Sequence, residues 1–272
     1  MILPGHSPVP LPAGRTRPAV AGLHAALLRD AARAGVAVLV VLLSMAVVAA
    51  RAAGLGADFI VKALLLFAAG AVWVWRGLRA GAHPHARFGA ANRVTLLRLA
   101  FASLLAALLG EAVPAPPLQP TSLAWVVFAL AALTALLDAV DGALARRSGL
   151  ASRFGARFDM ETDAAYTLVL CALVWQAGQA GPWVLAAGLM RYAFVAAAVP
   201  FPWLAGPLLP SRRRQAICAV QITTLIVCLV PIVPSSLASL LAAASLLLLG
   251  VSFAVDVRAL SQARRFDAER AA

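Results

Sequence analysis

The stretch LLDAVDGALARRSGLASRFGARFDMETDAAY, residues 136–166, carries four aspartates between two apolar segments of the chain. Together with its flanks it predicts two helices, at 122–145 and 159–177, joined by a short basic loop. Each helix is long enough to cross a bilayer, which takes about 20 mostly apolar residues. We therefore expect two antiparallel membrane helices whose carboxylates lie at one edge of the membrane.

The composition of the whole chain is that of a protein surrounded by lipid. Of its 272 residues, 62% are hydrophobic and only 12% are charged, and the mean hydropathy is +0.89. Soluble domains carry about 25% charged residues. A chain with half that charge cannot cover a water-facing exterior, so the composition predicts a multi-spanning membrane protein.

Eight apolar segments are long enough to cross a bilayer as helices, and no stretch shows strand-like alternation. They lie at about 35–53, 58–75, 94–112, 122–145, 159–177, 182–200, 214–233 and 236–256. We predict an all-α polytopic bundle with a six-helix catalytic domain at 94–257 and two additional transmembrane helices within 35–75. The other segments are an N-terminal segment at 1–34, a basic connector at 76–93 and a charged, helical tail at 258–272. Within the N-terminal segment, a short helix at 19–33 is expected to lie along the membrane surface.

The distribution of basic residues predicts the orientation of these helices. Arginines gather at 76–93, 146–158, 201–213 and in the tail, whereas the alternate connectors near 54–57, 113–121, 178–181 and 234–235 contain no Lys or Arg. By the positive-inside rule, both termini and the aspartate-rich loop are expected on the cytoplasmic side, in a bacterial inner (plasma) membrane. The same pattern explains the net charge of +12 without nucleic acid as a partner.

The histidines and cysteines predict no metal site. His83 and His85 are interpreted as members of a solvated loop rather than as a ligand pair. Cys171, Cys218 and Cys228 lie in apolar segments without CxxC spacing, so neither zinc nor a disulfide framework is indicated.

The first two aspartates share one face of their helix. Asp138 and Asp141 are three residues apart, and the small residues Gly142 and Ala145 continue that face up to Arg146. Small side chains at these positions would let a ligand approach the backbone.

The other two aspartates lie on the next helix, where Gly155, Asp159 and Asp163 recur at four-residue steps. If the two helices are antiparallel neighbours, all four carboxylates converge. Converging carboxylates repel one another unless a cation neutralises them. Mg²⁺ characteristically lies between carboxylates and substrate phosphates, so the pattern favours transfer at a lipid-borne phosphate ester or diphosphate. The alternatives are purely structural Asp–Arg pairs and a proton relay in a transporter.

The order D-x2-D-G-x2-A-R-x8-G-x3-D-x3-D resembles the signature of the CDP-alcohol phosphotransferases, also called CDP-alcohol phosphatidyltransferases. Every defined position is present, at Asp138, Asp141, Gly142, Ala145, Arg146, Gly155, Asp159 and Asp163. The resemblance covers roughly 90–257. It implies a six-helix membrane enzyme, commonly a homodimer, that transfers a phosphatidyl group from CDP-diacylglycerol to a small alcohol and releases CMP.

The resemblance also implies a role for each residue of the signature. Mg²⁺ or Mn²⁺ would be held by Asp138, Asp141 and Asp159, with Asp163 as general base that also touches metal. The cytidine nucleotide would lie against Thr95, Asp138, Gly142, Ala145, Arg146 and Gly155.

A second motif, NRVTLLR at 92–98, resembles the opening of the first family helix, in particular that of phosphatidylglycerophosphate synthases. Asn92, Thr95 and Arg98 share one face there, which in relatives borders the nucleotide and diphosphate. Alternatively, Asn92 caps the helix and Arg98 anchors to lipid headgroups.

Arginines elsewhere suggest where the acceptor binds. Arg191 falls in the middle of an apolar segment, where a charge needs a partner, and Arg212, Arg213 and Arg214 precede the next one. These side chains suit a phosphorylated acceptor, and we favour glycerol 3-phosphate over inositol phosphate, serine or another uncharged alcohol. The arginine triplet equally fits a purely topological role.

Overall fold

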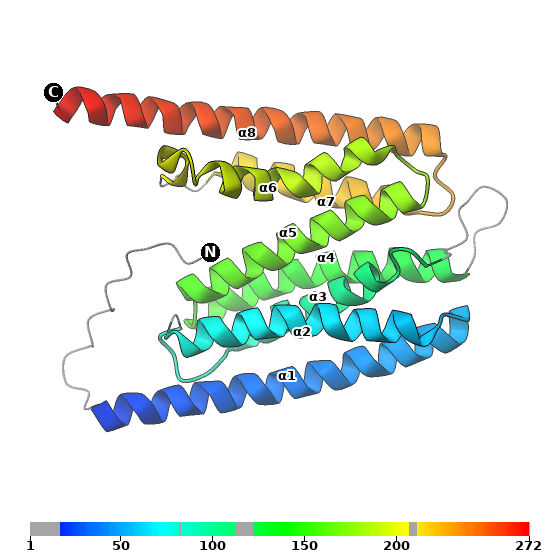
Figure 1. The fold of residues 1–272 in the computed structure, drawn as a ribbon, viewed down its shortest axis with the longest axis horizontal. Helices are drawn as coiled ribbons and strands as arrows, with labels where there is room; N and C mark the ends of the chain where they lie inside the picture. Colours follow the sequence, from blue (N-terminus) through cyan, green and yellow to red (C-terminus); the bar gives the residue numbers. More distant parts are fainter. Residues whose placement is uncertain (1–16, 82, 112–121, 207–210, 272) are drawn as a thin grey trace.

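The computed structural model describes residues 17–81, 83–111, 122–206 and 211–271, and side chains within them except those of 17–21, Arg146 and 265–271. The described residues form eight α-helices and two short 3-10 helices, and no strand (Figure 1). The elements are α1 (Arg17–Ala53), α2 (Ala57–Arg79), α3 (Ala90–Ala107), α4 (Ser122–Ser148), α5 (Arg153–Gln176), η1 (Pro182–Val184), α6 (Leu185–Ala197), η2 (Pro202–Ala205), α7 (Arg212–Cys228) and α8 (Ser235–Ala271). The prediction of an all-α bundle is confirmed.

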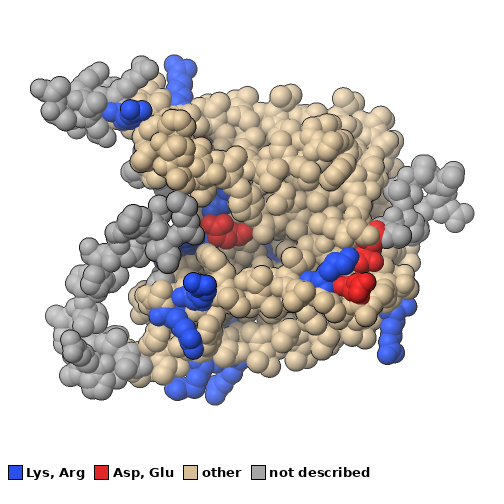
Figure 2. All heavy atoms as spheres, in the orientation of Figure 1, with Lys and Arg blue, Asp and Glu red and all other residues tan. Residues whose placement is uncertain are grey.

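Five helices in the described part of the chain are long and apolar enough to cross a membrane. These segments are Gly22–Ala53, Ala57–Arg79, Ala90–Ala107, Ser122–Ala145 and Ser235–Arg264, and Pro182–Ala197 is apolar but shorter. Figure 2 shows few charged side chains across the middle of the visible face, with most of them toward its ends. The chain is therefore a polytopic membrane bundle. The spans predicted over α5 and α7 form helices. Because α5 carries charged residues as far as Asp163 and α7 has 17 residues with three arginines in its first turn, their crossing of the membrane stays a prediction.

The first helix differs from the prediction of a surface helix followed by a separate span. Residues 19–53 belong to one uninterrupted helix, α1. Its buried side chains continue at three- and four-residue steps through both segments, at Leu27, Ala31, Ala34, Val38, Leu42, Ala46 and Ala50. Because one apolar stripe packs along the bundle over its whole length, nothing separates a surface helix from a spanning one.

Other helix ends also differ from the expected bounds. The third helix begins at Ala90 and ends at Ala107, so the connector after α2 is shorter than expected. The last helix continues to Ala271, which confirms a helical tail.

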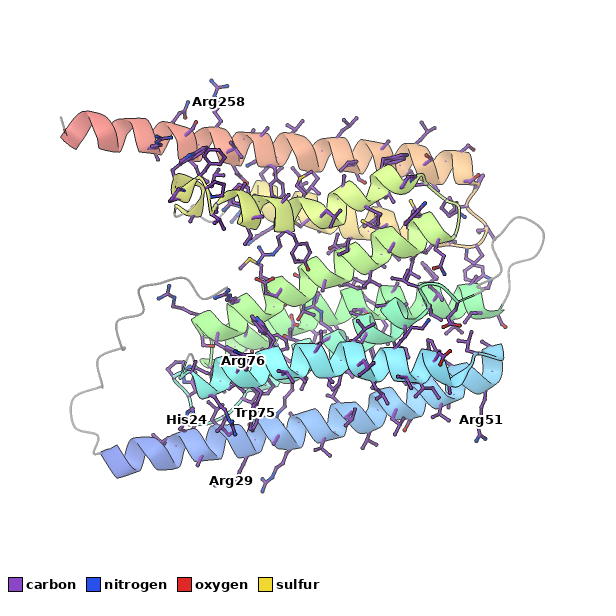
Figure 3. The ribbon with its side chains drawn as sticks, in the orientation of Figure 1. His24, Arg29, Arg51, Trp75, Arg76 and Arg258 are labelled. Atoms are coloured by element: carbon purple, nitrogen blue, oxygen red, sulfur yellow. The ribbon has the colours of Figure 1, made fainter. Side chains whose placement is uncertain are left out.

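The arrangement of the helices makes α3 the centre of the functional half of the bundle. It packs against α1 and α2 on one side and against α4 and α5 on the other, while α7 and α8 pair farther away. The start of α1, the end of α4 and the end of α8 lie at the same end of the bundle, at the left of Figure 1. We call this the site end. Figure 3 shows the labelled Arg29, Arg76 and Arg258 toward this end, whereas Arg51 lies at the opposite one.

His83 is buried rather than solvated, so the expectation is wrong for this residue, whereas His85 is partly exposed. Its Nε2 lies 2.9 Å from the Arg87 carbonyl oxygen and its Nδ1 lies 2.8 Å from Ser152 Oγ. Since a carbonyl only accepts, Nε2 carries the proton and Nδ1 accepts from Ser152, whose oxygen in turn accepts from the Gly155 N–H. Burial lowers the pKa of His83, which favours this neutral form. The side chain thus ties the connector before α3 to the first turn of α5.

Gly188 allows α6 to pack directly against α5. A Cβ at this position would lie 2.6 Å from the Leu168 Cα, a backbone atom that cannot move alone. We expect Gly188→Ala to lower the free energy of unfolding by about 1–3 kcal/mol, as overpacking does. Thermal unfolding in detergent measures this. The matched control is Gly250→Ala on α8, where a Cβ would meet nothing within 4 Å; equal melting temperatures for both variants would contradict the prediction.

Candidate active site

The guanidinium of Arg98, on α3, lies among all four aspartates of the signature. Its Nη1 is 2.7 Å from Asp141 Oδ2 and 2.7 Å from Asp159 Oδ1. Its Nη2 is 2.8 Å from Asp138 Oδ1 and also pairs with Asp163. The sequence predicted that the carboxylates converge, and they do. It did not predict that an arginine from a third helix joins them.

The burial of these side chains differs in a way that gives the cluster an open face. Arg98 is 1% exposed and Asp141 is 4% exposed, whereas Asp138 and Asp159 are each about 40% exposed. The inner carboxylate is therefore sealed by protein, and the outer ones remain accessible to a ligand.

The two aspartate helices are not packed neighbours, which corrects the expectation from the short loop. They run antiparallel, but α3 packs against both while they scarcely touch each other. Arg98 supplies the bridge between them. Farther into the bundle, the Tyr166 hydroxyl of α5 donates to the Ala131 carbonyl of α4 over 2.6 Å.

Thr95 and Asn92 support the cluster from α3. The Thr95 hydroxyl lies 3.1 Å from Asp141 Oδ2 and 3.1 Å from its own helix's Ala91 carbonyl oxygen. Asn92 is buried and donates to the Phe88 carbonyl, so it does not cap the helix, whose N-cap is Gly89. The absence of a side chain at Gly155 leaves room for Asn92, because a Cβ there would lie 2.8 Å from its Oδ1.

The remaining signature residues follow Asp141 along α4. Gly142 and Ala145 are partly buried in its last turns. Arg146 belongs to the same helix, but its side chain lies outside the described residues.

The donor set of the cluster fits a hard divalent cation. Asp138, Asp141 and Asp159 each offer a carboxylate oxygen, and these three atoms lie within 4.8 Å of one another. Carboxylate oxygens are the ligands that Mg²⁺ and Mn²⁺ prefer. The position of the Arg98 guanidinium shows independently that this point of the bundle accepts positive charge.

Three of the four arginines considered for the acceptor have a carboxylate partner. Arg191 donates to Glu161 over 2.7 Å, from α6 to α5. Arg213 donates to Ser252 and, over 2.6 Å, to Asp256 on α8. Arg214 contacts the same Asp256 at 3.3 Å, and Arg212 is exposed at the start of α7.

Sequence reasoning missed the partners Glu161 and Asp256. The sequence held a signal for Glu161. It lies two residues from both Asp159 and Asp163, so on a helix it points away from their shared face and needs a different partner. Its side chain contacts Arg191 of α6, on the side of α5 opposite Asp159 and Asp163.

The helix that carries Arg213 and Arg214, α7, packs against α5, the helix that carries Asp159 and Asp163.

The comparisons with known proteins assign the family. Neither the curated proteins nor the solved structures include a significant match to this chain. The sequence model of one family, CDP-alcohol phosphatidyltransferase, matches residues 88–256, more than half of the chain. The match begins just before α3, ends within α8, and includes the four aspartates and Arg98. The chain therefore belongs to the CDP-alcohol phosphatidyltransferase family, whose members are transferases.

Proposed function

We propose that this protein transfers a phosphatidyl group from CDP-diacylglycerol to a small alcohol, with glycerol 3-phosphate as the preferred acceptor. The observation that carries the proposal is the convergence of the four signature aspartates at one open-faced cluster within the matched family region. Transporters that relay ions need carboxylates along a path, whereas here one cluster holds all four.

Mg²⁺ or Mn²⁺ held by Asp138, Asp141 and Asp159 would neutralise the substrate diphosphate and the charge that develops on the leaving CMP. Three partly or fully buried carboxylates from two helices supply the oxygen ligands. Thr95 and Arg98 orient the Asp141 carboxylate, since both donate to its Oδ2.

Asp163 is proposed to act as the general base, with contact to the metal as a secondary role. It lies one turn beyond Asp159 on α5 and is a third exposed, so an acceptor hydroxyl can reach it. The carboxylate takes the hydroxyl proton, and the oxygen attacks the β-phosphorus. The bond from that phosphorus to the bridging oxygen breaks, and CMP leaves with the bridging oxygen.

The nucleotide is proposed to lie along the end of α4 and the start of α5. Gly142 and Ala145 present little or no side chain there, which lets a base or ribose approach the backbone. Gly155 is proposed to contribute through Asn92, which fills the space of its missing side chain. Thr95, Asp138 and Arg146 complete the proposed contacts, with Arg146 suited to the diphosphate.

The acceptor site is proposed at Arg191, Arg213 and Arg214. A phosphorylated acceptor would share these cations with Glu161 and Asp256, which hold them in place. Inositol phosphate would use the same arginines, whereas serine would not need them. We further propose a homodimer whose termini and site face the cytoplasm of a bacterium.

The direct test incubates purified protein with CDP-diacylglycerol, Mn²⁺ and one acceptor at a time, and follows CMP release. Release with glycerol 3-phosphate is the expected result. If CMP is released with a different acceptor but not with glycerol 3-phosphate, that acceptor takes its place in the proposal. If no acceptor gives CMP release, the proposal is overturned in favour of a transporter.

We expect Arg191→Gln to raise the KM for glycerol 3-phosphate by about 10- to 100-fold, because a hydrogen bond between charged groups contributes about 1.5–3 kcal/mol. The KM for CDP-diacylglycerol should stay within about twofold. The matched control is Arg258→Gln, an exposed arginine that points away from the bundle in Figure 3. An unchanged acceptor KM in the Arg191 variant would remove this residue from the acceptor site.

A further inference from the structure

The two N-terminal helices lie outside the matched family region, yet their polar side chains bind both ends of α3. At the site end, Asp30 of α1 accepts from the Phe88 N–H over 2.9 Å and pairs with Arg93. Phe88 is fully buried just before the first turn of α3. Its backbone is thus fixed from α1, and its carbonyl is fixed by Asn92.

At the opposite end, Lys62 of α2 binds the end of α3. Its ammonium lies 3.3 Å from the Leu109 carbonyl oxygen and 3.5 Å from that of Ala107, and it pairs with Glu111. The last carbonyls of a helix have no partner within the helix and carry the negative end of its dipole. A lysine at this place therefore fixes the end of α3 to α2. Gln176 of α5 binds the same turn through the Leu108 carbonyl and the Gly110 N–H.

Between these two anchors, α2 and α3 are in close contact. A Cβ at Gly70 would lie 2.7 Å from the Leu99 side chain, the residue that follows Arg98. The hairpin of α1 and α2 therefore holds α3 at its start, in its middle and at its end.

The anchors flank the residue that organises the aspartate cluster. Phe88 precedes Arg98 by ten residues and Ala107 follows it by nine. A helix rises about 1.5 Å per residue, so a slip of α3 by one residue would move the guanidinium by about that distance. The contacts of Arg98 at 2.7–2.8 Å would not survive it.

We propose that the α1–α2 hairpin sets the axial position of α3, and that Asp30 and Lys62 are positioning residues for the aspartate cluster. The hairpin is then a working part of the catalytic unit rather than an added anchor. The effect on catalysis rests on the proposed function. The axial position of α3 does not depend on that function.

The test compares Asp30→Asn and Lys62→Gln with the conservative variants Asp30→Glu and Lys62→Arg. Asp58→Asn, an exposed carboxylate on α2, is the matched control. Mn²⁺ affinity is measured on purified protein well below the melting temperature of every variant. We expect the Kd for Mn²⁺ to rise about tenfold in the two disruptive variants, and to stay within about twofold in the conservative variants and the control.

A second measurement is independent of metal. Spin labels at the exposed positions Ala90 on α3 and Arg157 on α5, in a chain with its cysteines replaced by alanine, report the distance between the helices. A broader or shifted distance distribution in the two disruptive variants supports the proposal. Unchanged distances and unchanged Mn²⁺ affinity beside a lower melting temperature would overturn it, since the hairpin would then only stabilise the fold. If the unaltered protein binds no Mn²⁺, the proposed function fails. The spin-label distances between α3 and α5 then decide by themselves whether the hairpin sets the position of α3.

Discussion

Replacing Asp163 with asparagine is expected to lower kcat by about 10²–10⁴-fold, the range that a positioned general base contributes. The amide has the size of the carboxylate and can still accept from Arg98, so the cluster keeps its shape. It cannot take a proton from the acceptor hydroxyl. CMP release measured at saturating CDP-diacylglycerol and acceptor gives kcat directly, and gel filtration with thermal unfolding verifies that the variant is folded.

Two comparisons separate a base from a metal ligand. Asp163→Asn should retain most of its Mn²⁺ affinity, whereas Asp141→Asn, which alters the sealed carboxylate of the cluster, should lose it. Glu161→Gln, two residues before Asp163, should raise the KM for the acceptor through Arg191 rather than lower kcat. A kcat within about threefold of the unaltered protein in Asp163→Asn would exclude the base assignment, since the smallest expected loss is about 100-fold.

Much of the site could be predicted because helical spacing and residue chemistry are local properties. The three-residue step from Asp138 to Asp141 and the four-residue step from Asp159 to Asp163 place each pair on one face of its helix. The cost of carboxylates near lipid then requires that both faces meet something polar or charged. Those two facts, together with the expectation that the two helices are antiparallel neighbours, predicted that the pairs converge; they do converge, although α3 lies between the helices.

What the sequence did not reveal depends on which helix packs against which. The short loop between α4 and α5 suggested direct contact, but α3 lies against both and supplies Arg98. A signal was available, because Arg98 lies in an apolar helix where an arginine needs a partner, the same reasoning that singled out Arg191. The partner of Arg191 could not be derived, since Glu161 is one of several acidic residues and only the packing of α5 on α6 selects it.

Replacing Arg98 with glutamine is expected to destabilise the metal-free protein more than any other single change at the site. Among the described side chains, Arg98 is the cation that contacts all four carboxylates. The formal charge of the cluster is −3 with this arginine and −4 without it. Removing one partner of a buried ion pair costs about 3–5 kcal/mol. We expect the lower end, about 3 kcal/mol, because three of the four carboxylates remain a third or more exposed to water.

Thermal unfolding in EDTA and in Mn²⁺ tests this expectation. The melting temperature of Arg98→Gln should fall in EDTA, and Mn²⁺ should raise it by more than in the unaltered protein, because the added cation replaces the missing charge. Arg98→Lys should lie between the two, since an ammonium keeps the charge but not the planar fork that reaches two oxygens with each end. Equal melting temperatures for Arg98→Gln and the unaltered protein in EDTA would show that the carboxylates do not depend on this arginine. In Arg98→Gln, Thr95 still donates a hydrogen bond to Asp141. A complete loss of Mn²⁺ binding in this variant would therefore show that Arg98 also positions the metal ligands, and does not only balance their charge.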